Sequence, residues 1–343
     1  MLGAGILAAS LETFAMALFS LIAVLLIEQL WPLPYRWAVH APLEKLAAYL
    51  ERVFNAGERR QGVIAWLVAV CGLVLVTGSV YAILHSINPL LAWSWNVLIL
   101  YLTMGFREFS HYYTDIQLAL SMDDLPHART LLAQWRGQSA DGLSSSEIAR
   151  LAIEKALGAS HRHVFGVLVC FVLLPGPTGA VLYRAAAFFA EVWGQRTDAD
   201  AGHFGVFSRQ AYRLIDWLPL RVTAAAFAVV GNFEDAVYCW RNQADKWSGS
   251  GSDSGPDGRP NHSLDSDHGS GIGIVLASGA GALGLCLGKP EVENGEIPGR
   301  AEVGKGAEAD VDSMQSAVGL VWRALLLWLL FLLLMGFASL VSK

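Results

Sequence analysis

Four side chains near two short apolar segments could together hold an anionic ligand: Tyr183, Arg184, Asp216 and Arg221. Two guanidinium groups in a low-dielectric surrounding bind phosphate oxygens strongly. Pro219 frees a backbone carbonyl that an arginine can bind, so a fixed Asp216–Arg221 pair beside a Pro-kinked turn is expected. We therefore predict one substrate-binding pocket facing the cytoplasm. In the alternative interpretation, this pair only closes a helix end.

Glycines recur at short spacing in IVLASGAGALGLCLGKP (274–290), which contains Gly281, Gly284 and Gly288. Glycine lets a backbone approach closely, either to a phosphate group or to a neighbouring helix. The segment lacks the Lys-Ser/Thr pair of a P-loop and does not follow a strand, as a dinucleotide-binding motif would. The glycine pattern therefore leaves ligand binding and helix packing both open.

The composition predicts an integral membrane protein. Of the 343 residues, 54% are hydrophobic and only 16% are charged, whereas soluble domains carry about 25% charged residues. The lipid bilayer is therefore an expected partner. No basic block with interleaved aromatics indicates a nucleic-acid partner. The four cysteines lie far apart, which argues against a disulfide framework or a zinc site.

Four apolar segments are long enough to be predicted membrane spans: Phe14–Leu30, Val63–Leu84, Leu90–Phe106 and Leu320–Val341. Basic residues follow the first segment rather than precede it, as Arg36, Lys45, Arg52, Arg59 and Arg60. A signal peptide would show the reverse order. The positive-inside rule then places the N-terminus outside and the following loop in the cytoplasm; the family resemblance given below implies that the membrane is a bacterial inner membrane.

The segment 107–162 is polar and is predicted to form amphipathic cytoplasmic helices. One helix is expected to begin at Asp123 or Asp124, with a proline in its first turn. A second is expected to begin at Ser144, because Glu147 three residues later completes a capping box.

The stretch HVFGVLVCFVLLPGPTGAVLYR (163–184) is apolar but is interrupted by PGPTG. If it crossed the membrane once, the arginine-rich region after it would lie outside, against the positive-inside rule. Broken backbone at membrane depth is tolerated where protein or a watery cavity satisfies it. We therefore predict a re-entrant, broken helical hairpin. The fold class is an all-α integral membrane protein with about four to five transmembrane helices and cytoplasmic helical loops.

These features divide the chain into six predicted segments. They are 1–106 (N-terminal membrane helices and first cytoplasmic loop), 107–162 (cytoplasmic helical loop), 163–247 (broken hairpin and polar pocket), 248–271 (disordered linker), 272–319 (glycine-rich cytoplasmic segment) and 320–343 (C-terminal transmembrane helix). The linker assignment rests on its Gly, Ser and Asp content, which cannot form a packed core.

A series of short motifs resembles, in order, the CobD/CbiB family. The motifs are DDLPHAR (123–129), EIARLAIE (147–154), GPTGAVLYR (176–184), DWLPLRVTA (216–224), AGALGLCLGK (280–289) and GEIPGR (295–300). The stretches LLIEQLW (25–31) and LIDWLPLR (214–221) also resemble AmpE, a relative implicated in β-lactamase regulation. The chain departs from the family pattern where an Arg-Asp-Thr motif and an Asn-Thr-Leu-Asp motif are expected.

The resemblance to the CobD/CbiB family implies a function in cobalamin biosynthesis. Such a protein joins adenosylcobyric acid, a corrinoid, to aminopropanol or its phosphate by amide ligation that requires ATP and Mg²⁺. It would make Glu154 and Asp216 catalytic Mg²⁺ ligands, with Arg184 and Arg221 holding phosphate. The resemblance to AmpE implies instead a non-enzymatic membrane sensor or regulator. A transporter is a third alternative, which the few spans and the lack of a visible inverted repeat disfavour.

Overall fold

The computed structural model describes residues 2–30, 39–54, 59–194, 204–249, 271–288 and 302–341. Residues 250–270, which make up nearly all of the linker predicted at 248–271, lie outside these ranges.

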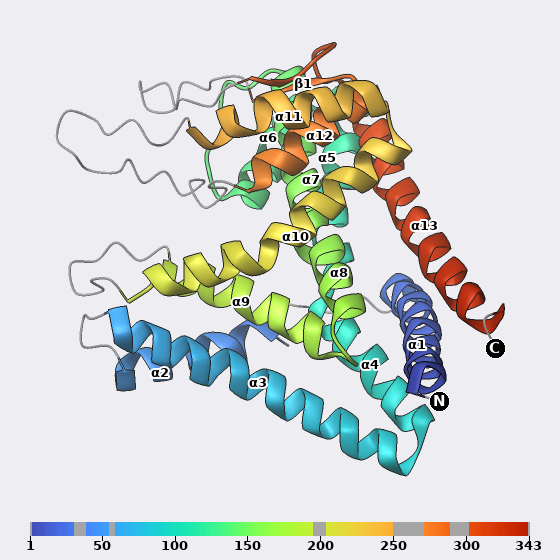
Figure 1. Ribbon diagram of the computed structural model, residues 1–343. Coiled ribbons are helices and arrows are strands. Elements are labelled where there is room, and N and C mark those ends of the chain that lie inside the picture. Colours follow the sequence, from blue (N-terminus) through green and yellow to red (C-terminus); the bar gives the residue numbers. More distant parts are fainter. Residues whose placement is uncertain are drawn as a thin grey trace. The chain divides into compact units, whose positions relative to one another are not determined.

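The described chain is built almost entirely of helices (Figure 1), as the sequence predicts. The helices are α1 (Leu2–Leu30), α2 (Ala41–Phe54), α3 (Arg59–Ile87), α4 (Pro89–Thr103), α5 (Phe106–Ser121), α6 (Leu125–Arg136), α7 (Ser145–Ser160), the π-helical turn η2 (His161–Phe165), α8 (Gly166–Leu173), α9 (Thr178–Gly194), α10 (Val206–Val230), α11 (Phe233–Gly249), α12 (Ile272–Leu283) and α13 (Val311–Val341). Two short antiparallel strands, β1 (Cys286–Leu287) and β2 (Val303–Gly304), pair with each other.

Several helices have the length and composition of membrane spans. Three described helical stretches are long and apolar enough to cross a bilayer, namely Arg59–Ile87, Ser145–Leu173 and Val311–Ala338, and shorter apolar helices cover Met16–Leu30, Pro89–Thr103 and Ile272–Leu283. Large apolar side chains such as Leu75 and Val76 are exposed on α3, and Leu326 and Leu333 are exposed on α13. Exposed apolar faces of this kind suit contact with lipid. The molecule is an all-α membrane protein.

The helices group into two compact units, each assembled from segments that are distant in sequence. Unit 1 contains Met1–Arg107, His163–Pro219 and Trp328–Lys343, and unit 2 contains Glu108–Arg162 and Leu220–Leu327. The six segments expected from the sequence remain a prediction, because composition along the chain does not reveal which segments pack together.

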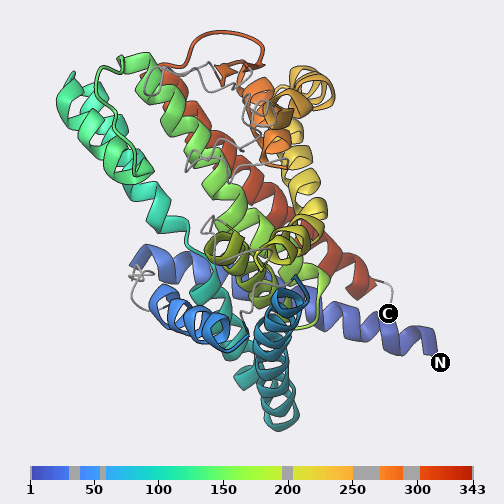
Figure 2. The same cartoon turned by 90° about the vertical axis from the view of Figure 1, so that its left-hand side faces the viewer.

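Unit 1 has an aromatic core between α2, α3 and α9. The rings of Phe189 and Trp193 stack with centroids 4.5 Å apart, and Phe204 meets Trp193 edge-on at 5.3 Å. Trp66 of α3 is buried in the same cluster. Aromatic pairs in these geometries add to the stabilisation from burial alone. Figure 2 shows unit 1 from the side where α2 ends and α3 begins.

The interrupted stretch in unit 1 forms a packed pair of helices. The short helix α8 ends at Leu173, residues 174–177 form the break, and α9 begins at Thr178. Gly176 adopts a left-handed conformation with φ +62°, which glycine tolerates well. A methyl group on Gly179 would clash with the carbonyl oxygen of Cys170, so the two backbones touch. The predicted helical hairpin is present, and its depth in the membrane remains a prediction.

Two local expectations differ from the structure. The amphipathic helix that begins at Ser145 is followed without a loop by η2 and α8, because no proline interrupts the chain before Pro175. Pro219 lies inside the 25-residue helix α10 rather than at a turn. A proline inside a helix removes one backbone hydrogen bond, and the helix can accommodate this loss by kinking. Neither Asp216 nor Arg221 therefore stands at a helix end.

Both predicted helix starts in the segment 107–162 are confirmed. The Asp124 side chain accepts a hydrogen bond of 3.1 Å from the backbone N–H of His127. Ser144 and Glu147 form a reciprocal capping box, in which the Ser144 backbone N–H donates to Glu147 Oε2 at 2.7 Å. Such caps satisfy amide groups that the first helical turn leaves without partners.

The close contact at Gly179 predicts an asymmetry between two glycine substitutions. Gly179→Ala should lower the free energy of unfolding by about 2 kcal/mol, because its methyl group forces α8 and α9 apart. Gly72→Ala on α3 should be neutral or slightly stabilising, because nothing lies within 4 Å of a methyl group there. Thermal unfolding of both purified variants in detergent measures the difference. Equal melting temperatures would contradict the hairpin packing.

Candidate functional site

The most buried of the predicted site residues in unit 1 is Tyr183 of α9, which has no exposed surface. Its hydroxyl donates a hydrogen bond of 2.9 Å to Asp216 Oδ1 on α10. The Tyr212 hydroxyl lies 3.2 Å from the same Tyr183 oxygen. Asp216 is itself buried. The structure therefore brings Tyr183 and Asp216 together and places Tyr212 beside them.

A glycine on α8 makes room for the Tyr183 ring. A methyl group on Gly166 would overlap the ring and the hydroxyl of Tyr183, so the ring lies directly against the α8 backbone. The ring is thus held by α8 on one side and by Asp216 on the other. A buried carboxylate that accepts a hydrogen bond from a fixed donor is held in one orientation, which limits its freedom to bind a ligand.

The two predicted phosphate-binding arginines occupy different surroundings. Arg184 follows Tyr183 on α9 in unit 1 and is half-buried. Arg221 is also half-buried but belongs to unit 2. The four-residue pocket proposed from the sequence therefore remains a prediction, of which the Tyr183–Asp216 contact is the part seen within one unit.

Glu154 contacts the glycine-rich segment in unit 2. This buried side chain of α7 accepts a hydrogen bond of 2.7 Å, through Oε1, from the backbone N–H of Gly288. Gly288 directly follows β1 and has φ +77°, a left-handed conformation that favours glycine. The carboxylate thereby fixes the end of the glycine-rich segment to α7.

The other predicted glycines shape the packing of α12. Gly281 faces α11, where a methyl group would collide with the backbone of Asp235 and Ala236. α11 and α12 accordingly lie side by side (Figures 1 and 2). Gly284 ends α12 in a left-handed conformation with φ +68°, and its N–H bonds to the Ala280 carbonyl. At Gly281 the glycine serves helix packing, and at Gly284 it serves a helix C-cap.

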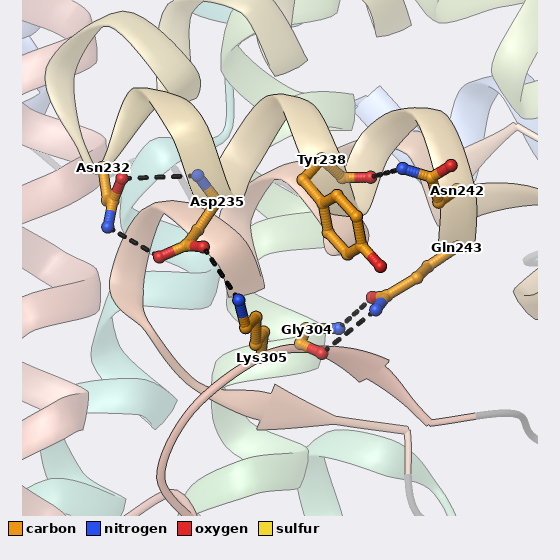
Figure 3. A network of polar contacts seen from close by, with 7 residues as sticks. All are labelled: Asn232, Asp235, Tyr238, Asn242, Gln243, Gly304 and Lys305. Atoms are coloured by element: carbon orange, nitrogen blue, oxygen red, sulfur yellow. Dashed lines mark hydrogen bonds and ion pairs between the residues drawn. The ribbon is translucent and has the colours of Figure 1, made fainter.

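A polar network clamps β2 onto α11 in unit 2 (Figure 3). Gln243 accepts from the Gly304 N–H at 2.6 Å and donates to the Gly304 carbonyl at 3.3 Å. Asp235 accepts from Asn232 Nδ2 at 2.8 Å and lies 3.9 Å from Lys305 Nζ. Burial raises the pKa of the neighbouring Cys239 thiol, and the negative charge of Asp235 raises it further. These contacts hold the strand pair that carries the glycine-rich segment.

Sequence reasoning missed a buried polar group in unit 2. The His161 Nδ1 lies 2.9 Å from Thr223 Oγ1, and both residues are completely buried. The Ser278 hydroxyl of α12 donates to the carbonyl of Ala224 at 2.8 Å. The signal in the sequence was the polar triplet His-Arg-His at 161–163 between two apolar stretches, where a polar side chain is costly unless it has a partner.

The described residues contain no preformed cluster of metal-binding side chains. Within those parts of the chain, no group of three or more His, Cys, Asp or Glu side chains is placed to hold a metal ion. Mg²⁺ prefers several oxygen ligands in near-octahedral geometry. Glu154 and Asp216, the predicted Mg²⁺ ligands, belong to different units, and each already accepts a hydrogen bond within its own unit.

Comparison with known proteins gives consistent relationships along most of the chain. A model of the family described as CobD/Cbib protein matches residues 20–256. The cobalamin biosynthesis protein CobD of Stutzerimonas stutzeri is 33% identical over 321 residues, which cover 92% of this chain and 97% of the relative. CobD of Chromobacterium violaceum is 30% identical over 323 residues, covering 91% and 94%. CbiB of Salmonella typhimurium is 24% identical over 305 residues, covering 86% and 88%. No solved structure gives a significant match.

The Tyr183–Asp216 contact predicts a measurable coupling. Tyr183→Phe and Asp216→Ala should each destabilise unit 1, and the double variant should lose less than the sum of the two. A coupling of about 1.5–3 kcal/mol is expected for a buried hydrogen bond to a charged group. Chemical unfolding of the purified single and double variants measures it. Additive losses would show that the hydrogen bond contributes no stability.

The clamp on β2 predicts different effects at two adjacent positions. Gln243→Ala should cost about 1–3 kcal/mol, because both hydrogen bonds to Gly304 are lost. Asn242→Ala should have little effect, because this exposed side chain bonds only to the Tyr238 carbonyl of its own helix. Hydrogen exchange of residues 302–310 should accelerate in Gln243→Ala alone. Equal exchange in the two variants would refute the clamp.

Proposed function

Because the chain belongs to the CobD/CbiB family, we propose that it acts in cobalamin biosynthesis as a membrane protein with a corrinoid substrate. The observation that carries the proposal is the similarity to proteins named CobD along nearly the whole chain. The matched region extends over the hairpin α8–α9, over the residues Tyr183 and Asp216 and over the glycine-rich segment, so the similarity is not confined to one isolated motif.

The finer proposal is the amide ligation that the family resemblance implies. In this reaction the carboxyl group of adenosylcobyric acid is joined to the amino group of aminopropanol or its phosphate, and ATP with Mg²⁺ would supply the activation. The described residues contain no cluster of three or more possible metal ligands, and Mg²⁺ that acts with a nucleotide is commonly held by one or two carboxylates together with substrate phosphates. In the described parts of the chain, hydrogen bonds fix the backbone at two points of this region: Glu154 accepts from the Gly288 N–H, and Gln243 accepts from the Gly304 N–H.

A second candidate function is a non-enzymatic membrane sensor or regulator, as the resemblance to AmpE suggests. Two observations favour it. The chain reads RGQSADGLSSSE at 136–147, where the family carries Arg-Asp-Thr, and the two carboxylates expected to bind Mg²⁺ are engaged in the protein interior. A regulator could retain the fold of the family while its polar residues serve packing.

A growth experiment separates the two candidates. The host is a cobalamin-requiring bacterium whose own gene for this step is deleted, supplied with either adenosylcobyric acid or adenosylcobinamide. The parent protein should restore growth on adenosylcobyric acid, and an empty vector should support growth only on adenosylcobinamide. Failure of a well-expressed parent to restore growth would reject the ligase and favour the regulator. Mass spectrometry of the corrinoids would confirm formation of the amide.

Glu154→Gln provides a sharper test of the role of this residue. Glutamine retains an oxygen that can accept the Gly288 hydrogen bond but loses the charge that a Mg²⁺ ligand needs. We expect at least half of the parent's growth rate and an unchanged melting temperature. A loss of activity by about 10²-fold or more at unchanged stability, typical of losing a metal ligand's charge-stabilising role, would show that Glu154 acts in catalysis.

A further inference from the structure

Four exposed arginines gather at one end of unit 1. Arg59 and Arg60 begin α3, and Arg209 and Arg213 lie in the first half of α10. The Arg59 guanidinium donates a hydrogen bond of 2.7 Å to the Gln210 side chain, which brings the two helices together at this end. We call these four residues the arginine corner.

An exposed stripe on α10 leads away from the arginine corner and changes in polarity. Its members follow one another at helical spacing: Arg209, Gln210, Arg213, Leu214, Trp217 and Leu218. The first three are polar, whereas Leu214, Trp217 and Leu218 are large apolar residues with 79%, 54% and 39% of their surface exposed. Residues at i, i+4 and i+8 lie on one side of a helix, so the stripe is continuous.

The same change from basic to apolar occurs along α3. After Arg59 and Arg60, the exposed residues are Ile64, Leu67 and Val68, with 49%, 44% and 51% of their surface accessible. Both helices begin at the arginine corner, which lies on the left in Figure 1. α3 continues as a stretch long and apolar enough to span a membrane. Two helices that meet at the arginine corner thus each have a basic start followed by exposed apolar residues.

The opposite side of α10 is already packed within unit 1. On that side Asp216 accepts from Tyr183. Arg209, at the start of the exposed stripe, also donates through Nη1 to the Gly194 carbonyl at 2.6 Å, which fixes this end of α10 to the end of α9. Phe207 and Tyr212 pack against the aromatic core. The exposed stripe is therefore the outer surface of a helix that is fixed from inside. Glu51 of α2 and Glu191 of α9 provide two carboxylates on neighbouring helices. The four positive charges of the arginine corner outnumber these two negative charges.

We propose that the arginine corner binds the headgroup phosphate of an anionic phospholipid, whose acyl chains lie along the apolar flanks of α3 and α10. Guanidinium groups bind phosphate oxygens through charge-assisted, bidentate hydrogen bonds. Trp217 is of a type enriched at the membrane boundary. A free phosphate ion would use the arginines but not the apolar flanks, so their continuity favours a lipid. The proposal does not depend on the reaction the protein catalyses.

The test compares lipids on the full-length protein purified in a neutral detergent. Melting temperatures are recorded with added phosphatidylglycerol, with phosphatidylcholine, and with inorganic phosphate. Phosphatidylglycerol should raise the melting temperature of the parent at lower concentration than phosphatidylcholine, and inorganic phosphate should give no comparable increase. An equal effect of the two lipids, or an equal effect of inorganic phosphate, would overturn the proposal.

Charge-neutral variants locate the site. In the double variant Arg59→Gln/Arg213→Gln, the phosphatidylglycerol concentration that gives half of the maximal increase in melting temperature should rise about 30-fold. The reason is that each arginine near an anionic lipid surface contributes about 1 kcal/mol. The matched control is Arg241→Gln, which removes an exposed arginine from α11 in unit 2. This control should respond as the parent does. A similar loss in the control, or an unchanged response in the double variant, would refute the assignment.

Trp217→Ala tests the apolar part of the surface independently of charge. Relative to the variant's own melting temperature in detergent alone, it should weaken the response to phosphatidylglycerol several-fold, because the side chain is more than half exposed. An unchanged lipid response in this variant would show that only the phosphate is recognised and would overturn the lipid proposal.

Discussion

Close approach of helix backbones at glycine is the constraint on which this structure depends. Lipid is as apolar as leucine, so helices in a bilayer associate through tight packing and hydrogen bonds rather than through a hydrophobic drive. In unit 1, Gly179 brings α9 against the α8 backbone, and Gly166 accepts the ring of Tyr183. In unit 2, Gly281 brings α12 against α11. Because glycine has no side chain, the helices can come close together at these points, and the polar contacts that hold each unit together can form.

The buried polar groups follow from this packing. Asp216 can be buried because Tyr183 supplies a donor, and Tyr183 can supply it because Gly166 leaves space for its ring. Glu154 is buried in the same way, with the Gly288 N–H as its donor. Buried carboxylates without such partners would be strongly unfavourable. A carboxylate that appears in sequence as a candidate metal ligand can thus be required by the fold itself.

Local features were predictable from the sequence, and long-range pairing was not. The caps at Asp124 and Ser144, the apolar helices and the break at PGPTG depend on residues that are neighbours in the chain. The Tyr183–Asp216 contact could be suspected only because both residues flank apolar segments. The Gly288–Glu154 contact joins residues 134 positions apart, and the His161–Thr223 contact joins residues 62 apart. The prediction of a kinked turn at Pro219 was wrong, because a proline more often ends a helix than lies within one.

The distribution of exposed residues constrains how a polar substrate could reach the protein. The flanks of α3 and α13 carry exposed Leu, Val and Phe side chains, which suit lipid and disfavour a polar corrinoid. In unit 2 the start of α11 and the end of β2 also carry polar residues, namely Asn232 just before α11, Asp235 and Asn242 on it, and Lys305 just after β2, beside the exposed rings of Phe233 and Tyr238 (Figure 3). Charged and amide side chains of this kind require water. The surface of α11 beside the strand that Gln243 holds in place is therefore more polar than the flanks of α3 and α13.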